Sequence, residues 1–302
     1  METLVGTASW TDKTLLDCGR FYPKEAKTAE VRLRHYASIF PLVEVDSSYY
    51  AMPSEANARR WAERTPEGFT FNVKAFRFFT GHMTQTEVLP ADLCLQLGTH
   101  RRIYYKDVGE DLRTELWQRF ESSLEPLRAA GKLGLIHFQF PPSVTCARRP
   151  MQHVEQCIAR LPKDTLSIEF RHESWWQNAK RSADTVAWLR DIGAVHTVVD
   201  GPQGVVNSVP ALWESTHPDY ALLRLHGRNV TTYNAKVQSA AERFEYDYLD
   251  DELAELAELA GEAVRLAFKV KRIHVIFNNC HEDKGQRNAQ TFMKKLQEVG
   301  EQ

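Results

Sequence analysis

The chain has 302 residues, of which 43% are hydrophobic and 26% charged, an ordinary balance for a soluble globular protein. Its formal net charge of −2 argues against a dedicated nucleic-acid binder, although a local basic patch stays open. The five cysteines form no C-x-x-C pair, and the N-terminus has neither a basic start nor a long apolar run. We therefore expect a reducing, cytoplasmic location, with no signal peptide and no membrane association.

Short apolar runs alternate with longer amphipathic segments along the whole chain. The apolar runs, which we expect to be strands, are Leu4–Ala8, Leu42–Val45, Phe69–Val73, Leu133–Phe140, Leu166–Phe170, Ala194–Val199, Ala221–Leu225 and Ile273–Phe277. The expected helices are Lys24–Ile39, Ser54–Glu63, Asp111–Ala129, Met151–Leu161, Ala183–Asp191, Asp250–Phe268 and Gly285–Val299. A long connection follows the third run, and a Pro- and Gly-rich one precedes the seventh.

This alternation predicts an α/β fold, a single (β/α)8 TIM-type barrel over residues 1–302 with a long loop insertion after strand 3. No linker or change of composition divides the chain into domains. A doubly wound open sheet is the alternative. It is less favoured because no Gly-rich phosphate-binding turn follows the first strand.

Alternation within each strand predicts which side chains point into the barrel. Apolar residues such as Val43 and Val45 face the helices, so the residues between them face the axis. The inward polar positions are then Glu44, Asp46, Asn72, Lys74, His137, Gln139, Glu169, Arg171, Arg224, His226, Arg228 and Asn278. Barrel enzymes hold their active sites at the carboxyl ends of the strands. We therefore expect a charged site there, with cationic capacity left over for an anion, or else a closed network of salt bridges.

Roles can be assigned within this set. We expect Glu169, Glu44 and His226 to be catalytic and to move protons. The expected substrate-binding residues are Lys74, Gln139, Arg171, Arg228 and Asn278, together with the aromatic residues Trp10, Tyr49 and Trp175 that follow strand ends. Arg171 and Arg228 are expected to hold one oxyanion between them. The expected ligand is therefore a small anion that carries phosphate.

No cofactor is expected at this site. A divalent metal on Glu169, Asp200 and His226 is an alternative, because these residue types are suitable ligands. It is disfavoured because Arg171 and Arg228 would crowd a cation.

Eight segments are similar to the YecE-like family, also called Domain of Unknown Function 72. They are GTASW (Gly6–Trp10), FYP (Phe21–Pro23), VEVDSSYYAMPS (Val43–Ser54), FTFNVKA (Phe69–Ala75), FQFPPS (Phe138–Ser143), IEFRHESWW (Ile168–Trp176), RLHGR (Arg224–Arg228) and FNNC (Phe277–Cys280). The resemblance implies a (β/α)8-type barrel, and it implies no established reaction.

Three functions remain open. The first is an enzyme, a hydrolase or lyase, acting on an anionic small molecule or nucleic-acid component. The second is a non-catalytic nucleic-acid-binding barrel that uses the basic, aromatic stretch His100–Lys106. The third is a barrel whose polar interior is purely structural. Gln139 and His226 stand where retaining glycosidases carry carboxylates, which argues against an ordinary glycosidase. The sequence indicates no oligomeric state.

Overall fold

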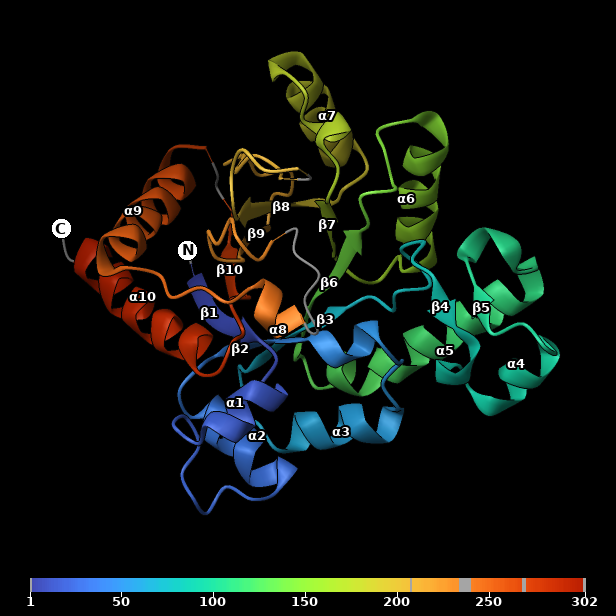
Figure 1. Ribbon diagram of the computed structural model, residues 1–302, viewed down its shortest axis with the longest axis horizontal. Helices are drawn as coiled ribbons and strands as arrows, with labels where there is room; N and C mark the ends of the chain where they lie inside the picture. Colours follow the sequence, from blue (N-terminus) through green and yellow to red (C-terminus); the bar gives the residue numbers. More distant parts are fainter. Residues whose placement is uncertain (1, 207, 234–239, 268–269, 301–302) are drawn as a thin grey trace.

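Eight parallel strands close into a barrel in this computed structural model, which describes residues 2–206, 208–233, 240–267 and 270–300 (Figure 1). The barrel strands are β1 (Glu2–Ala8), β2 (Leu42–Val45), β3 (Thr70–Lys74), β6 (Leu133–Phe140), β7 (Leu166–Phe170), β8 (Val195–Asp200), β9 (Tyr220–Leu225) and β10 (Arg272–Phe277). Their order around the barrel follows their order along the chain, and β1 pairs with β10 to close it. The predicted TIM-type barrel is therefore confirmed.

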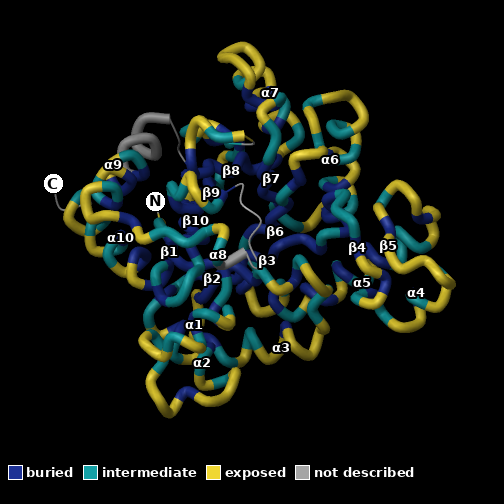
Figure 2. Tube along the Cα trace, in the orientation of Figure 1, coloured by how far each residue is buried: buried dark blue, intermediate teal, exposed yellow. Residues whose placement is uncertain are grey.

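Helices surround the barrel and expose their outer faces, while the strands are buried (Figure 2). The longer helices are α2 (Ala29–Ala37), α3 (Glu55–Glu63), α5 (Glu110–Ala129), α6 (Arg148–Arg160), α7 (Ala179–Asp191), α9 (Asp250–Ala267) and α10 (Lys284–Gly300). The helix expected from Lys24 begins only at Ala29, because the Thr28 side chain caps it. The short helix α1 (Lys13–Cys18) was not predicted, because its one buried side chain, Leu15, gives no periodicity.

The long insertion predicted after the third strand is confirmed, but it has structure of its own. It contains a pair of short antiparallel strands, β4 (Thr84–Gln85) and β5 (Arg102–Ile103), with α4 (Ala91–Gln96) between them. Phe79 stacks on Trp117 of α5, with ring centroids 3.8 Å apart. The insertion is thus packed against the barrel's helical shell.

The barrel interior is filled by side chains from the alternate positions that the sequence predicted. Glu44 of β2 and Glu169 of β7 both contact Arg224 of β9, and neither strand is a neighbour of β9. Such contacts are possible only through the interior, so the predicted inward orientation of these three residues is confirmed. Among the described helices, none is long and apolar enough to cross a membrane.

Candidate functional site

A fully buried ion network lies at the centre of the barrel. Arg224 is 0% exposed and donates from Nη2 to Glu44 Oε1 at 2.7 Å and from Nη1 to Glu169 Oε2 at 2.7 Å. Nε adds a third bond, to Glu44 Oε2 at 3.2 Å. One guanidinium therefore joins two carboxylates from different sides of the barrel, as a planar fork of donors allows.

The second oxygen of Glu169 is hydrogen-bonded to two residues nearer the mouth of the barrel, the end at which the carboxyl ends of the eight strands lie. Oε1 accepts from Arg171 Nη1 at 2.8 Å and from Gln139 Nε2 at 2.6 Å. Burial alone would raise the pKa of Glu169, but the charges of Arg224 and Arg171 outweigh it and hold that pKa well below its usual value. Glu169 is therefore an ionised carboxylate with both oxygens bonded. Its expected role in moving protons stays a prediction.

His226 is a neutral imidazole at the same level. Its Nε2 lies 3.1 Å from Arg171 Nη1, and its Nδ1 lies 2.7 Å from the side-chain amide of Asn278. Burial lowers the pKa of His226 to about 3. Both ring nitrogens thus face N–H donors, Nε2 the guanidinium of Arg171 and Nδ1 the amide of Asn278, and Nε2 also lies 3.4 Å from Glu169 Oε1. The Phe244 ring stacks on the imidazole, with centroids 5.0 Å apart.

A second charged pair and an extra cation lie at the ends of β2 and β3. Lys74 donates to Asp46 at 2.8 Å, and its Nζ is 4.8 Å from the centre of the Tyr49 ring. The guanidinium of Arg77 is 5.2 Å from the same ring. Its buried Nε has no hydrogen-bond partner among the described residues. Arg77 therefore adds a positive charge to this edge of the barrel.

Arg228, which was expected to bind an anion together with Arg171, has carboxylate partners of its own in the structure, and its expected role stays a prediction. Arg228 forms ion pairs with Asp200 at 2.9 Å, with Glu252 at 3.4 Å and with Glu255 at 3.5 Å. No hydrogen bond or ion pair joins these residues to Arg171 in the described part of the chain. The cause is Gly227, whose φ of +83° turns the chain after β9 and breaks the side-chain alternation.

The expectation that Trp10 and Trp175 contact a ligand is corrected. Trp175 is 0% exposed and stacks on Phe170, with ring centroids 3.7 Å apart. Trp10 is buried edge-on against Trp61 of α3, at 5.8 Å. Both rings pack between the barrel and its helices, because the chain turns outward after β1 and β7. Of the three predicted aromatic contacts, Tyr49 alone is placed beside the charged groups of the mouth.

The structure places Asp200 apart from Glu169 and His226, the other two residues of the alternative metal site. Asp200 stands beside Leu225 in the strand register, on the face of β8 that points to the helices. There it accepts from Tyr248 Oη at 2.6 Å. The described residues contain no group of three or more His, Cys, Asp or Glu side chains that could hold a metal.

Sequence reasoning missed three residues that complete the mouth. Arg77 lies beyond the end of β3, where strand alternation no longer applies. Tyr233 and Phe244 come from the connection between β9 and α9, and their ring centroids lie 5.6 Å and 6.0 Å from the Arg171 guanidinium. No strand or helix periodicity in the sequence indicates that Tyr233 and Phe244 lie beside Arg171.

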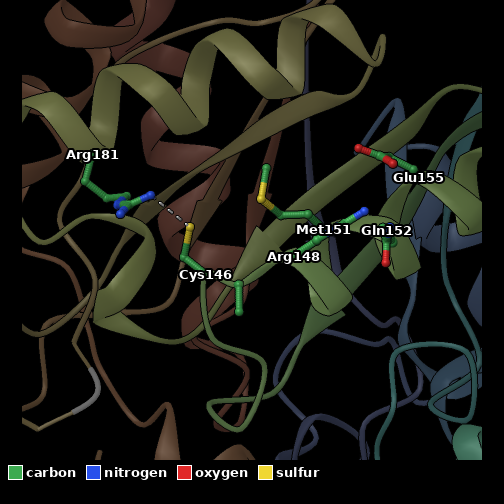
Figure 3. A pocket seen from close by; sticks show the side chains of 7 residues that line it. Cys146, Arg148, Met151, Gln152, Glu155 and Arg181 are labelled. Carbon is green, nitrogen blue, oxygen red and sulfur yellow. Dashed lines mark hydrogen bonds between the residues drawn. The ribbon is translucent and has the colours of Figure 1, made fainter.

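A separate cavity of about 430 Å³ opens at the start of α6, facing α7 (Figure 3). Its lining includes Cys146, Arg148 and Arg181, and Arg181 Nη1 donates to Cys146 Sγ at 3.7 Å. None of the residues that the sequence predicted for the site lines it. We therefore take the barrel mouth as the candidate site.

Comparison with known proteins agrees with the fold and the resemblance. The family described as "Protein of unknown function DUF72" matches residues 4–302. The UPF0759 protein YunF of Bacillus subtilis (strain 168) is 29% identical over 278 residues, covering 91% of this chain and 88% of YunF. Crystal structures of two DUF72 family proteins are also similar. The one from Enterococcus faecalis V583 has a TM-score of 0.79 at 25% identity, over 98% of this chain and 95% of that one. The one from Thermotoga maritima MSB8 has a TM-score of 0.74 at 28% identity, over 98% and 100%.

Proposed function

The chain belongs to the DUF72 family, whose description gives no activity, and we propose from its barrel mouth that it binds a small anion carrying phosphate there. Arg171 is the principal residue that binds the anion. Lys74 and Arg77 act from the end of β3, which is separated from β7 by one strand, β6. The proposal concerns binding first, and any reaction would follow from it.

The charges of the interior support a binding role for the outer residues and a structural role for the inner ones. Glu44, Asp46 and Glu169 are matched by Lys74, Arg171 and Arg224, so this set is neutral. Burying ions costs several kcal/mol each unless they are paired, and the inner ions meet this requirement.

Arg77 is added to that neutral set without an ion pair to any described residue. The mouth therefore carries a positive excess of one charge. The sequence had suggested spare cationic capacity among Lys74, Arg171, Arg224 and Arg228.

The single observation that carries the proposal is the incomplete bonding of Arg171. Among the described residues, Nη1 of Arg171 donates to Glu169 Oε1 and lies 3.1 Å from His226 Nε2. The side chain of Arg171 is 12% exposed. Nε and Nη2 have no hydrogen-bond partner within the part of the chain that the structure describes. A guanidinium presents two parallel N–H groups along such an edge, which is the geometry that a phosphate oxygen pair accepts.

Neutral groups beside Arg171 would orient the rest of the ligand. His226 is uncharged near pH 7 and Gln139 carries an amide, so neither opposes an anion. The rings of Tyr233 and Phe244 cover the guanidinium and lower the local dielectric constant, which strengthens a charge-assisted bond.

Proton transfer by Glu169, Glu44 or His226 is a secondary part of the proposal, after anion binding. Glu169 is held ionised by its cationic neighbours, and His226 has a pKa of about 3, so neither titrates near neutral pH. A ligand anion that drew Arg171 away would leave Glu169 with Arg224 as its remaining cation. The geometry therefore supports binding better than acid–base catalysis.

Crystals soaked in selenate provide a direct test, because selenium is an anomalous scatterer and selenate has the shape of phosphate. We expect an anomalous peak within hydrogen-bond distance of Nε and Nη2 of Arg171, and no such peak in crystals of Arg171→Ala. A peak only at other sites, or the same peak in both proteins, would contradict the proposal.

A further inference from the structure

A second cavity, separate from the mouth, lies on the insertion after β3. It has a volume of about 610 Å³ and is lined by Gly81, Tyr104, Tyr105, Lys106, Arg113, Ser143, His153 and Gln156. It is thus formed where the insertion meets α5 and α6, which lie together on one side of the barrel (Figure 1). Small-molecule sites have volumes of roughly 300–1,000 Å³, so this cavity could hold a ligand of nucleotide size.

One wall of the cavity is a fixed aromatic ring. Tyr105 Oη accepts from Trp117 Nε1 at 3.1 Å, and the ring lies 5.2 Å from Phe78 and 4.7 Å from His153 between centroids. These contacts hold Tyr105 without a ligand. Tyr104 is different, since it is 43% exposed at the rim and can stack on a planar ring.

The cavity is also basic. The guanidinium of Arg113 lies 5.0 Å from the centre of the Tyr105 ring, and among the described residues its one carboxylate partner is Glu110, at 3.5 Å. Glu110 is 61% exposed and is shared with Arg160, so it offsets little of the charge of Arg113. Lys106 contacts the Tyr104 ring at 6.0 Å and has no ion pair with a described residue.

His153 supplies a neutral acceptor to the same cavity. Its Nε2 lies 2.7 Å from the carbonyl oxygen of Phe79, and burial lowers its pKa. The neutral ring donates from Nε2 to that carbonyl, which leaves Nδ1 as an acceptor. An acceptor of this kind suits the amino group of a nucleobase.

We infer that this cavity binds a nucleoside monophosphate, with the base against Tyr104 and Tyr105 and the phosphate on Lys106 and Arg113. An exposed tyrosine, two cations with little counter-charge and a neutral acceptor match a planar ring, an anion and an amino group. The site shares no residue with the barrel mouth, so it does not depend on the function proposed there.

The test is calorimetric titration of the full chain with adenosine 5′-monophosphate, in the Arg171→Ala background so that the mouth contributes nothing. Lys106→Ala and Tyr104→Ala change exposed side chains and leave the core intact. Each should weaken binding by about tenfold, the effect of losing one charge-assisted contact or one stacked ring. Lys180→Ala on α7 is the matched control and should bind like the parent, because that side chain is 84% exposed and its one ion pair among the described residues is with Asp184.

Two simpler probes separate the parts of the ligand. Adenosine and inorganic phosphate, each alone, should bind more weakly than the monophosphate by about tenfold or more. No binding of the monophosphate at millimolar concentration, or equal binding by Lys106→Ala and Lys180→Ala, would overturn the inference. So would tighter binding of single-stranded oligonucleotides with the same dependence on Lys106, because it would identify a nucleic-acid surface instead.

Discussion

Arg224 and Glu44 form a two-pronged ion pair through the centre of the barrel, with Nη2–Oε1 at 2.7 Å and Nε–Oε2 at 3.2 Å. Both side chains are 0% exposed. The remaining nitrogen of Arg224 bonds Glu169, which in turn bonds Arg171 at the mouth. The network therefore runs from a closed interior to a partly exposed cation, and its two ends should respond differently to mutation.

Glu169→Gln should destabilise the protein, because it removes the buried negative charge that forms ion pairs with both Arg224 and Arg171. Breaking such a pair typically costs about 3–5 kcal/mol in the free energy of unfolding. Urea denaturation at pH 7 measures this, with Lys180→Ala as a control that should change little. A loss below about 1 kcal/mol would support the sequence-based view that Glu169 is a base rather than a structural ion.

The stability of the protein should fall as the pH falls from about 6.5 toward about 4, because histidines are buried in neutral form. Burial lowers the pKa of His226 and of His274 to about 3 and that of His196 to about 4. The unfolded chain binds protons at these residues near pH 6.5, and the folded chain does not. Each histidine then contributes a slope of at most about 1.4 kcal/mol per pH unit.

Denaturation curves at pH 7, 6 and 5 test this dependence, and NMR spectra of the imidazole groups test its cause. The three histidines should remain unprotonated in the folded protein at pH 5. Glu169 acts at lower pH than the histidines. Because its pKa in the folded protein is depressed, the stability that Glu169 contributes is lost only as the pH falls below 4.5, the ordinary pKa of a glutamate. Signals of His226 that titrate near pH 6.5 would contradict the buried neutral imidazole.

Trp175→Phe should lower stability without changing ligand binding. The indole Nε1 donates to the Val144 carbonyl at 2.9 Å, and its ring stacks on Phe170. Losing that bond and part of the ring should cost about 1–3 kcal/mol, measured by thermal denaturation. If the variant keeps its stability but loses anion affinity, Trp175 contacts the ligand after all.

Prolonged dialysis against EDTA should leave the melting temperature unchanged, and elemental analysis should find no stoichiometric zinc, manganese or iron. The reason is that Asp200 points away from Glu169 and His226 and is bonded to Tyr248 and Arg228. Arg171 and Arg224 also surround Glu169, so a cation there would be repelled. About one bound transition metal per chain would show that these groups rearrange around an ion.

Much of the fold could be predicted from the sequence, because each barrel strand must turn apolar residues outward. That rule placed Glu44, Glu169 and Arg224 inside the barrel. It could not identify their partners, because the shear of the barrel decides which residues of different strands lie at one level.

The same rule failed where a strand had ended. The positive φ of Gly227 turns the backbone before Arg228. After β7 the side chain of Trp175 is buried between the barrel and its helices. The connections between strands and helices have no hydrophobic periodicity that shows where a side chain points. This rule therefore could not find Arg77, Tyr233 and Phe244, which lie in such connections. The residues on the strands were therefore found from the sequence, whereas those in the connections beyond the strand ends were missed.

The most direct test of the proposed function is calorimetric titration with inorganic phosphate at low ionic strength, comparing the parent protein with Arg171→Ala and Arg228→Ala. Both changes remove one guanidinium, but of the two arginines it is Arg171 whose Nε and Nη2 have no hydrogen-bond partner among the described residues, whereas Arg228 is paired with Asp200. Arg171→Ala should weaken binding by about 1.5–3 kcal/mol, and Arg228→Ala should bind like the parent. Equal binding by Arg171→Ala and the parent, or a loss confined to Arg228→Ala, would contradict an anion site built on Arg171.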